Sequence, residues 1–474
     1  MITAATKQLN VVLIATYELG RQPFGLGSAA AWIGGRGARV KCADVSREAL
    51  DNGAVRAADL LAFHVPMHTA TRLAVALLPA LRGLNPRAHV CFFGLYAPVN
   101  EAYLRRLGVQ TILGGEFEGG LASLVARLQA LNGSETDPES GRAATSQIEP
   151  VISTARLKFE VPERDGMPRL EKYARLVMPG GEKRFVGATE ASRGCKHLCR
   201  HCPIVPVYRG VFRIVDREVV MADIRQQVQA GAQHITFGDP DFFNGVGHAL
   251  PLVDALHREF PALTYDATIK IEHLLKHRAV LPRLRETGCL FVTSAVESVD
   301  GAVLEKLEKH HTRADFLRVV QIFHEEGLGL QPTFVPFTPW TTRESYLDLL
   351  GVLRDNELVE SVAPIQLVIR LLIPAGSRLL ELGEIQRLVK PFDEAALVYP
   401  WKHPDAHMDA LCERLQEIVH AGEKMNLSRA QIFERIETAA EESLGVEAER
   451  VARRARPPLV ARAAVPYLNE PWYC

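Results

Sequence analysis

The chain has 474 residues, with 55 lysines and arginines against 56 aspartates and glutamates, and 8 cysteines. This length corresponds to about three domains. The balanced charge gives no support to a nucleic-acid or membrane-surface footprint, and the sparse cysteines exclude a disulfide scaffold. The apolar run at residues 9–16 is too short for a membrane span and has no cleavage-like site after it. We therefore expect a cytoplasmic protein that begins with a β-strand.

Residues 1–131 alternate between short apolar runs and helical patterns. The apolar runs lie at residues 9–15, 39–45, 59–65, 89–94 and 109–113, and the helical patterns lie at residues 28–35, 67–81, 100–107 and 118–131. Strands separated by helices of this length are typical of βαβ units and a parallel sheet. We predict an α/β fold that begins with a doubly wound domain, whose ligand crevice lies at the carboxyl ends of the strands.

A linking and bridging segment is predicted at residues 132–184, and its first part is rich in Ser, Thr, Glu, Gly and Pro. Strand and helix patterns resume over residues 185–382, with strands expected at residues 187–193, 233–238, 263–268, 290–295, 328–335 and 365–372. Six strands in βα register predict a partial (β/α)6 barrel, with the chemistry on the loops after its strands. Residues 383–474 are expected to form a helical C-terminal region, in which Ser428 and Gln431 have the spacing of a capping box.

Three cysteines, Cys195, Cys199 and Cys202, lie within eight residues directly after the first barrel strand, in the spacing C-x3-C-x2-C. Three thiolates on one tight loop can hold three irons of a [4Fe–4S] cluster and leave the fourth iron open to a ligand. The loop is basic, which suits an anionic cluster and a carboxylate-bearing ligand. The alternatives are a zinc site with His197 or His201 as fourth ligand, or three buried structural cysteines.

This cysteine spacing on a βα barrel resembles the signature of the radical S-adenosylmethionine (SAM) superfamily. The resemblance implies reductive cleavage of SAM at the cluster, usually to a 5′-deoxyadenosyl radical that abstracts hydrogen from a substrate. It also implies SAM contacts from the loops after later strands, although the Gly-Gly-Glu-type turn is matched here in position only. The residues implied in these contacts are Gly238, Asp239, Pro240, Asp241, Glu297, Ser298, Thr338 and Arg370. The alternative for each of them is a structural role.

The first domain resembles the cobalamin-binding domain that precedes the barrel in cobalamin-dependent radical SAM enzymes. The resemblance implies close backbone approach of the cofactor at five glycines, Gly25, Gly27, Gly94, Gly114 and Gly115. The sequence has no Asp-x-His-x-x-Gly motif, so a cobalamin here would lack a histidine as lower ligand. The alternative is a degenerate domain that binds no cobalamin, and we interpret His64 and His68 as ordinary polar residues.

The remaining cysteines divide into two kinds. Cys42, Cys91 and Cys289 fall in predicted strands and Cys412 falls in a predicted helix, where a buried small side chain is expected. The last residue is Cys474, and the ending resembles a radical SAM group whose chains end in Cys-Cys-Ala-Glu-Pro or Cys-selenocysteine-Ala-Glu-Pro. The resemblance implies that the chain continues with selenocysteine and that Cys474 is catalytic. The alternative is a tail that ends in cysteine.

The sequence thus predicts a radical SAM enzyme that acts on a small molecule. Cobalamin-dependent methyl transfer competes with cobalamin-independent radical transfer or rearrangement, including transfer of a SAM-derived aminocarboxypropyl group to a soft element such as arsenic. The expected protein partner is an electron donor such as flavodoxin or ferredoxin. The alternative from another class is a non-catalytic metal- or cobalamin-binding regulatory protein. The neutral charge and the lack of an appended basic domain count against transfer-RNA modification.

Overall fold

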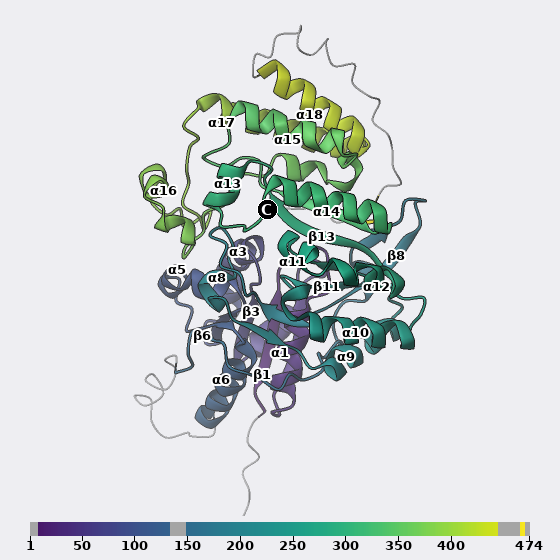
Figure 1. Ribbon diagram of the computed structural model, residues 1–474. Coiled ribbons are helices and arrows are strands. Elements are labelled where there is room, and N and C mark those ends of the chain that lie inside the picture. Colours follow the sequence, from purple (N-terminus) through teal and green to yellow (C-terminus); the bar gives the residue numbers. More distant parts are fainter. Residues whose placement is uncertain (1–7, 133–147, 444–464, 470–474) are drawn as a thin grey trace, which may run out of the picture.

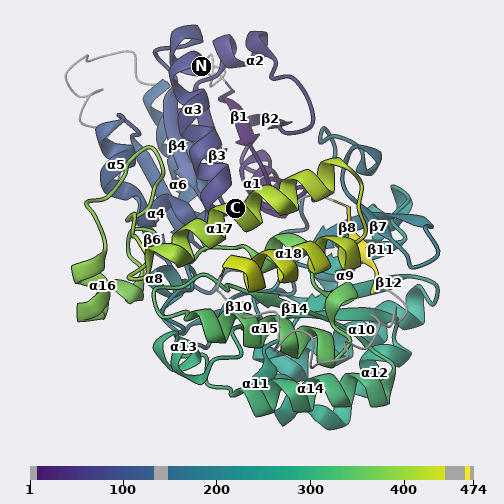
Figure 2. The same cartoon turned by 90° about the horizontal axis from the view of Figure 1, so that it is seen from above.

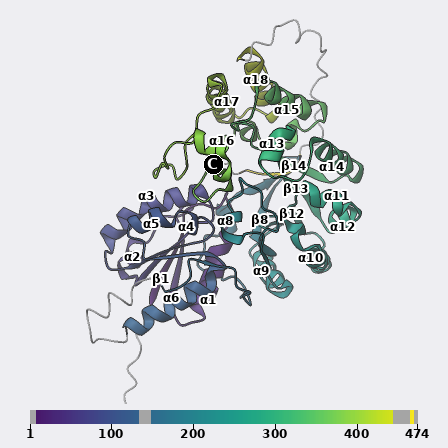
Figure 3. The same ribbon diagram turned by 60° about the vertical axis from the view of Figure 1, so that its left-hand side comes forward.

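The computed structural model describes residues 8–132, 148–443 and 465–469. Two β-sheets, one in the N-terminal part and one in the middle of the chain, lie side by side, and each is covered by its own helices (Figure 1, Figure 3). The C-terminal helices pack over the second sheet's helical layer (Figure 2). The predicted fold class is confirmed, whereas the domain boundaries after residues 131, 184 and 382 stay predictions.

The N-terminal sheet is parallel, and its strands have the order β2-β1-β3-β4-β5-β6. Alternate residues of β1 enter different cores: Val11 and Leu13 pack toward α1 and α6, whereas Val12 and Ile14 pack toward α3. Helices therefore cover both faces, as predicted for a doubly wound domain. The elements are β1 (Asn10–Ala15), α1 (Phe24–Gly34), β2 (Arg39–Asp44), α2 (Asn52–Ala57), β3 (Leu60–His64), α3 (His68–Leu84), β4 (His89–Phe93), α4 (Tyr96–Val99), α5 (Glu101–Arg106), β5 (Thr111–Gly115), α6 (Phe117–Asn132) and β6 (Ile152–Ser153).

The segment predicted as a linker contributes a sixth strand to this sheet. Strand β6 pairs in parallel with Gly114 and Gly115 of β5. Further along the same segment, Arg164 bonds Gln22 of the first domain at 2.9 Å and Asp223 of the second at 2.8 Å. Residues 148–182 therefore join the two halves through specific polar contacts.

The second sheet has seven strands in the order β14-β13-β12-β11-β8-β7-β15. Strands β8 and β11 to β14 are parallel, and β7 and β15 extend the β8 edge in antiparallel pairing. The sheet is curled and open, so it is a half-barrel. Its elements are β7 (Arg175–Val177), β8 (Lys183–Thr189), α9 (Arg217–Gln229), β11 (His234–Phe237), α10 (Val246–Glu259), β12 (Thr264–Thr268), α11 (Ile271–Lys276), α12 (Leu281–Glu286), β13 (Cys289–Glu297), α13 (Gly301–Lys306), α14 (Arg313–Glu326), β14 (Gly329–Phe334), α15 (Arg343–Asp355) and β15 (Tyr467–Leu468).

The sixth barrel strand, predicted at residues 365–372, is wrong as a regular strand. Residues Pro364–Leu367 form a 3-10 turn, and a single parallel bridge joins Phe337 to Arg370. The backbone N–H of Phe334, at the end of β14, donates to the side-chain oxygen of Gln366 at 3.1 Å. Because the Gln366 side chain takes this ladder position and Pro364 has no N–H, a continuous strand does not form here.

The C-terminal region contains α16 (Gly383–Leu388), α17 (Ala406–Lys424) and α18 (Arg429–Ser443). Ser428 and Gln431 exchange side-chain-to-backbone hydrogen bonds of 2.9 and 3.2 Å, so the predicted capping box is confirmed. As expected, Cys42, Cys91, Cys289 and Cys412 are all buried. Cys474 lies outside the described residues. Among the helices of the described part, none has the length and apolar character needed to span a bilayer.

Candidate active site

The three-cysteine loop leaves the half-barrel at its first strand. The predicted strand at residues 187–193 divides: β8 ends at Thr189, and β9 (Ser192–Gly194) turns away to pair with β10 (Phe212–Ile214). Gly194 has a φ of +72°, and a Cβ atom there would lie 2.4 Å from the Val211 carbonyl oxygen. Only glycine fits this turn, so the β9–β10 ribbon closes the base of a loop that carries Cys195, Cys199 and Cys202.

The three thiols share one buried environment. Cys195 and Cys199 are buried and Cys202 is half-buried. Burial raises the pKa of Cys202 to about 12, and the neighbouring Cys199 and Cys195 raise it further. Metals bind the deprotonated thiolate form of cysteine. The positive charge of a metal group at this loop must therefore offset the free-energy cost of deprotonating these buried thiols.

The spacing of the three sulfur atoms bears on what the loop can hold. Within the described residues, the sulfurs are not a set whose mutual distances all lie within 4.8 Å. One tetrahedral zinc ion with bonds of about 2.3 Å would bring thiolate sulfurs to about 3.8 Å from one another. The wider set suits three corners of an iron–sulfur cluster, each with its own iron.

Asp239 secures the entry to this loop. Its carboxylate accepts hydrogen bonds from the backbone N–H of Ala191 at 2.9 Å and the hydroxyl of Ser192 at 2.5 Å. Burial raises its pKa to about 7, although these hydrogen bonds oppose the shift. The neighbouring Gly238 donates its N–H to Thr189 at 2.8 Å. Asp239 thus ties the turn after β11 to the start of the cysteine loop, and its predicted contact with SAM stays a prediction.

Glu297 links the end of β13 to the cysteine loop. Its φ is +67°, a strained conformation for a residue with a side chain, and it follows an irregularity in the pairing with β14. The carboxylate lies 3.0 Å from His201 Nε2 and 3.4 Å from Lys309 Nζ. Burial opposes ionisation, but the Lys309 charge and the contacts of both partners outweigh it and lower the pKa of Glu297 to about 2. A fixed carboxylate therefore stands beside the residue that precedes Cys202.

Other residues predicted to bind SAM make contacts within the protein. The Ser298 hydroxyl accepts the backbone N–H of Asp300 at 3.0 Å, and the hydroxyls of Thr338 and Thr341 lie 2.8 Å apart. Arg370 bonds Asp409 of α17 at 2.6 Å and lies 3.7 Å over the ring of Trp401. Arg370 therefore attaches the C-terminal helices to the barrel, and the structure does not bring it together with the cysteine loop through these contacts. Pro240 lies in the turn after β11.

The five predicted ligand-facing glycines of the first domain pack against the chain itself. A Cβ at Gly25 would lie 2.3 Å from His64 Nε2, and one at Gly115 would lie 2.1 Å from the Ser153 carbonyl oxygen. For the other three, the nearest atoms belong to Glu163 at Gly27, Val65 at Gly94 and Pro98 at Gly114. These contacts explain why the five positions need glycine, and the predicted approach of cobalamin to them stays a prediction.

Arg193 is a central residue that the sequence prediction missed. It lies in β9, two residues before Cys195, and its side chain is 7% exposed. Its guanidinium contacts Glu118 at 2.6 Å, Glu190 at 2.7 Å and Glu116 at 3.6 Å. Since Glu116 and Glu118 belong to the first domain, one buried arginine joins that domain to the cysteine loop. An arginine beside the motif is a weak sequence signal, because its partners are distant in the chain.

Asn244 and Lys270 were also missed, and both contact the cysteine loop. The side-chain oxygen of Asn244 accepts the backbone N–H of Lys196 at 3.2 Å and lies 3.9 Å from Cys195 Sγ. Lys270, after β12, places its ammonium 3.9 Å from Cys199 Sγ. A buried cation at this position suits thiolates.

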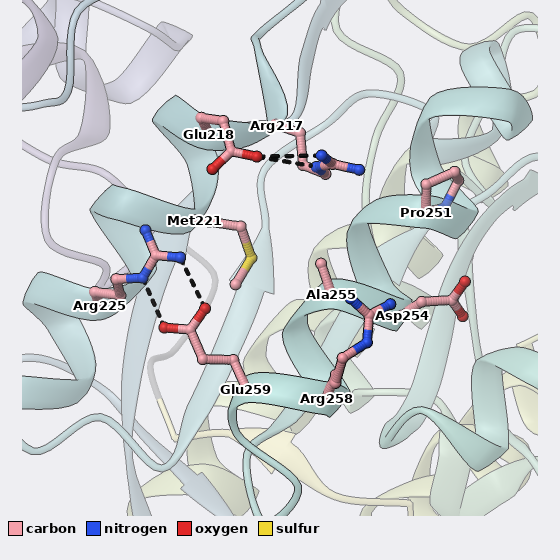
Figure 4. A pocket seen from close by; sticks show the side chains of 9 residues that line it. All are labelled: Arg217, Glu218, Met221, Arg225, Pro251, Asp254, Ala255, Arg258 and Glu259. Carbon is pink, nitrogen blue, oxygen red and sulfur yellow. Dashed lines mark hydrogen bonds and ion pairs between the residues drawn. The ribbon is translucent and has the colours of Figure 1, made fainter.

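Two surface pockets differ in their relation to this site. One, of about 560 Å³, lies where the first domain meets the cysteine loop, with Pro98 and Ile152 on one side and Leu198 on the other. The other, of about 490 Å³, lies between α9 and α10 on the outer helical layer (Figure 4). Its Arg225 and Glu259 pair at 2.6 and 2.8 Å. The second pocket carries no group of the candidate site.

A family model matches the part of the chain that contains the cysteine loop and most of the half-barrel. Residues 189–350 match the radical SAM superfamily, and this range includes the cysteine loop and the strands β11 to β14. The chain carries a radical SAM domain. The prediction of a radical SAM protein is confirmed at this level.

Solved structures of radical SAM enzymes share the fold well beyond this domain. The cobalamin-dependent SAM radical enzyme OxsB, with aqua-cobalamin bound, matches with a TM-score of 0.70 and 15% identity over 95% of this chain and 74% of its own. The radical SAM methyltransferase TsrM from Kitasatospora setae, with cobalamin and a [4Fe–4S] cluster bound, matches with a TM-score of 0.56 and 17% identity over 74% of each chain. At these identities the likeness establishes the fold.

Curated radical SAM relatives match a smaller part of the chain. Hopanoid C-3 methylase from Methylococcus capsulatus is 24% identical over 235 residues, 48% of this chain and 43% of that protein. A tRNA-2-methylthio-N(6)-dimethylallyladenosine synthase from Caldicellulosiruptor saccharolyticus is 25% identical over 174 residues, 35% of this chain and 36% of that protein. The chain thus covers less than half the length of either relative, and their substrates are not transferable by similarity alone.

Proposed function

We propose that this radical SAM protein is an enzyme that holds a [4Fe–4S] cluster on Cys195, Cys199 and Cys202 and acts on a small molecule. The observation that carries the proposal is the loop itself: three thiols, buried or half-buried, lie together after the carboxyl end of the first barrel strand. Carboxyl ends of barrel strands are where the chemistry of such folds is found.

When bound, the cluster supplies the electron for reductive cleavage of SAM. The residues of this chain have three tasks around it. Asp239 and Asn244 fix the backbone on which the cysteines lie. Glu297 holds His201 beside Cys202, and Lys270 places positive charge next to Cys199. Burial of these groups excludes water, which strengthens each electrostatic contact.

Anaerobic reconstitution with iron and sulfide, followed by SAM and a reductant, tests the proposal. We expect a brown protein with broad visible absorption that consumes SAM. The product identifies the bond that is cleaved, because 5′-deoxyadenosine, S-adenosylhomocysteine and methylthioadenosine each report a different one. A fully reconstituted protein that consumes no SAM would contradict the enzyme. A colourless zinc protein after anaerobic purification would favour the regulatory alternative instead.

Cobalamin-dependent methyl transfer is the second candidate function. The fold likeness to OxsB over 95% of the chain favours it. The five glycines pack against the chain's own atoms, which explains their identity and leaves cobalamin binding to the titration. Titration of the purified protein with hydroxocobalamin decides between them: a saturable change in the cobalamin spectrum that survives gel filtration supports binding, and its absence supports cobalamin-independent radical transfer.

The proposed substrate class and partners rest on weaker support. TsrM has been solved with tryptophan bound, which favours a small-molecule substrate for this fold. The tRNA-modifying relative from Caldicellulosiruptor saccharolyticus matches about a third of the chain. The net charge of −1 gives the protein no overall positive charge to attract nucleic acid. We propose a cytoplasmic enzyme that receives electrons from a flavodoxin or ferredoxin. Catalysis by Cys474 belongs to the same proposal.

A further inference from the structure

Three ligand-bearing side chains other than the three cysteines converge at the cysteine loop. His197 lies within the loop, Asp241 lies in the turn after β11, and His273 lies in α11. One ligand atom from each lies within 4.8 Å of the other two, and within the part of the chain that the structure describes no other set of histidine, cysteine or carboxylate groups meets this criterion. The three residues come from separate elements, so the fold and not the local sequence brings them together.

The distances are those of a group that can close around one ion. Asp241 Oδ2 lies 2.7 Å from His273 Nδ1 and 3.7 Å from His197 Nε2. A tetrahedral ion with bonds of about 2.1 Å to nitrogen and oxygen separates its ligand atoms by about 3.4 Å. The two observed distances bracket this value, and the two histidine ligand atoms lie within 4.8 Å of each other, so small side-chain shifts would complete the coordination.

The same atoms lack other partners. Asp241 Oδ2, His197 Nε2 and His273 Nδ1 are buried, and none has a hydrogen-bond partner of acceptable geometry. Asp241 is 0% exposed and His273 is 7% exposed. A buried polar atom left without a partner destabilises the folded protein. An ion at their meeting point would satisfy all three at once.

The surroundings also suit a divalent cation. Glu272 Oε2 lies 3.7 Å from His197 Nδ1, the ring nitrogen that faces away from Asp241. Histidines that bind metals commonly donate their second N–H to a carboxylate, which orients the ring. Lys270 is the cation that faces this group, with its ammonium 3.9 Å from Glu272. The two carboxylates outnumber it and leave the group net negative.

We propose that His197, Asp241 and His273 bind one divalent transition-metal ion, such as Zn²⁺ or Fe²⁺, separate from the iron–sulfur cluster. Two imidazoles and one carboxylate are a ligand set for such ions that leaves coordination positions open to water or substrate. The ion would tie the cysteine loop to the turns after β11 and β12. This proposal does not depend on SAM cleavage, since its ligands are distinct from the three cysteines.

Metal analysis of the reconstituted full-length protein tests it. The protein is loaded anaerobically with iron and sulfide, exposed to Zn²⁺ and passed through a desalting column. We expect one zinc ion per chain in addition to the cluster iron. In D241N and in H273Q the bound zinc per chain should fall at least tenfold, while both variants keep the visible absorption of the cluster. The matched control is H277Q, because the His277 ring lies 6.0 Å from that of His273 and is outside the set. Unchanged zinc in D241N and H273Q, or no zinc in the cluster-loaded wild type, would overturn the proposal.

Cobalt binding provides a second measurement that does not need the cluster. In C195S/C199S/C202S the thiolates are absent, so Co²⁺ bound by nitrogen and oxygen should give visible d–d absorption without a sulfur-to-cobalt charge-transfer band. Addition of D241N to this variant should abolish the absorption. A triple variant that keeps the circular dichroism of the parent protein but binds no Co²⁺ counts against the site, and a charge-transfer band that persists would assign the metal to a thiol elsewhere.

Discussion

The carboxyl edges of the two sheets follow the same topological rule but have different contents. At the edge of the half-barrel, the buried side chains of Glu297 and Lys270 lie beside the cysteine loop that contains Cys195. Several buried polar atoms around this loop have no hydrogen-bond partner. At the edge of the N-terminal sheet, Gly25 meets His64 and Gly115 meets Ser153, while Glu116 and Glu118 each keep a buried carboxylate oxygen without a hydrogen-bond partner. Parallel-sheet topology identifies both edges as ligand crevices. Whether an edge binds a ligand depends on which groups are left unsatisfied there.

Arg193 relates the two edges to each other. It leaves the half-barrel directly before Cys195 and ends among Glu116 and Glu118 of the first domain. The rings of Phe117 and Phe159 lie 5.2 and 4.9 Å from its guanidinium carbon. The N-terminal edge therefore contacts the residue two positions before Cys195 through these side chains. The first domain is, by these contacts, a support for the candidate active site.

The largest expected effect concerns the half-barrel edge. C199A should lose nearly all cluster iron and all SAM cleavage, because three cysteines are needed for a site-differentiated cluster. C412A is the matched control, since Cys412 is buried in α17 and lies outside the loop. Iron content and visible absorption after anaerobic reconstitution are the measurements. Equal iron in C199A and C412A would contradict the assignment of this edge as the cluster site.

The next effect concerns the junction. R193M removes the partner of three buried or half-buried carboxylates, and breaking a buried ion pair in this way costs about 3–5 kcal/mol. R225M, on the outer pocket of Figure 4, removes an exposed pair and should cost about 0.2–1 kcal/mol. Chemical denaturation followed by circular dichroism measures both. If R193M costs no more than R225M, the two edges are not joined through this residue.

Glu297 tests how the half-barrel edge supports its loop. E297Q removes the charge that holds His201 and Lys309, and loss of such an outer partner of a metal site typically costs about 10–100-fold in affinity or activity. The rate of SAM cleavage and the half-life of the cluster under a chelator are the readouts. E305Q, at an exposed position of α13, is the control and should leave both unchanged. A normal rate and half-life in E297Q would show that this edge is organised by other groups.

The pH dependence of stability should report on the N-terminal edge. Burial raises the pKa of Glu116 from 4.5 to about 7, although the Arg193 charge opposes the shift. Between pH 4.5 and 7, folding therefore takes up a proton at Glu116. The contribution of this group to the free energy of unfolding is fully present below pH 4.5 and is lost as the pH rises through 7. The side chain in E116Q stays neutral at every pH. As the pH rises across this interval, the stability of E116Q relative to the wild type should therefore increase by about 1–3 kcal/mol. Thermal unfolding from pH 4.5 to 8 measures the difference, and E101Q, on the surface of α5, should follow the wild type.

The smallest effects separate packing from ligand binding at the glycines. G25A should destabilise by about 1–3 kcal/mol, because its methyl group would overlap the buried His64 ring. G34A, at the end of the same helix with no atom within 4 Å of its Cβ position, should stabilise by about 0.4–1 kcal/mol. Thermal unfolding without any cofactor is sufficient. If G25A were as stable as the wild type without any cofactor, packing against His64 would not explain the glycine at position 25.

The sequence by itself determined the two α/β units and the cysteine loop. Alternation of apolar strands with helical patterns is a local signal, and it located β1 to β5, β8 and β11 to β14 to within a few residues. The spacing of Cys195, Cys199 and Cys202 is also local, so it could be read without any structure. Where one side chain replaced backbone pairing, as Gln366 does at the end of β14, the prediction of a sixth strand failed.

Only the tertiary structure decided which predicted residues share a site. Arg370 was expected near the cofactor but pairs with Asp409, and the five glycines face the chain itself. Conversely, Arg193 meets Glu118 across 75 residues of sequence, and Asp241 meets His273 across α10 and β12. Contacts between distant segments depend on how sheets and helices pack, and no periodicity or motif encodes them. The physical reason is that a residue's chemistry is set by its neighbours in space, whereas a sequence pattern reports only its neighbours along the chain.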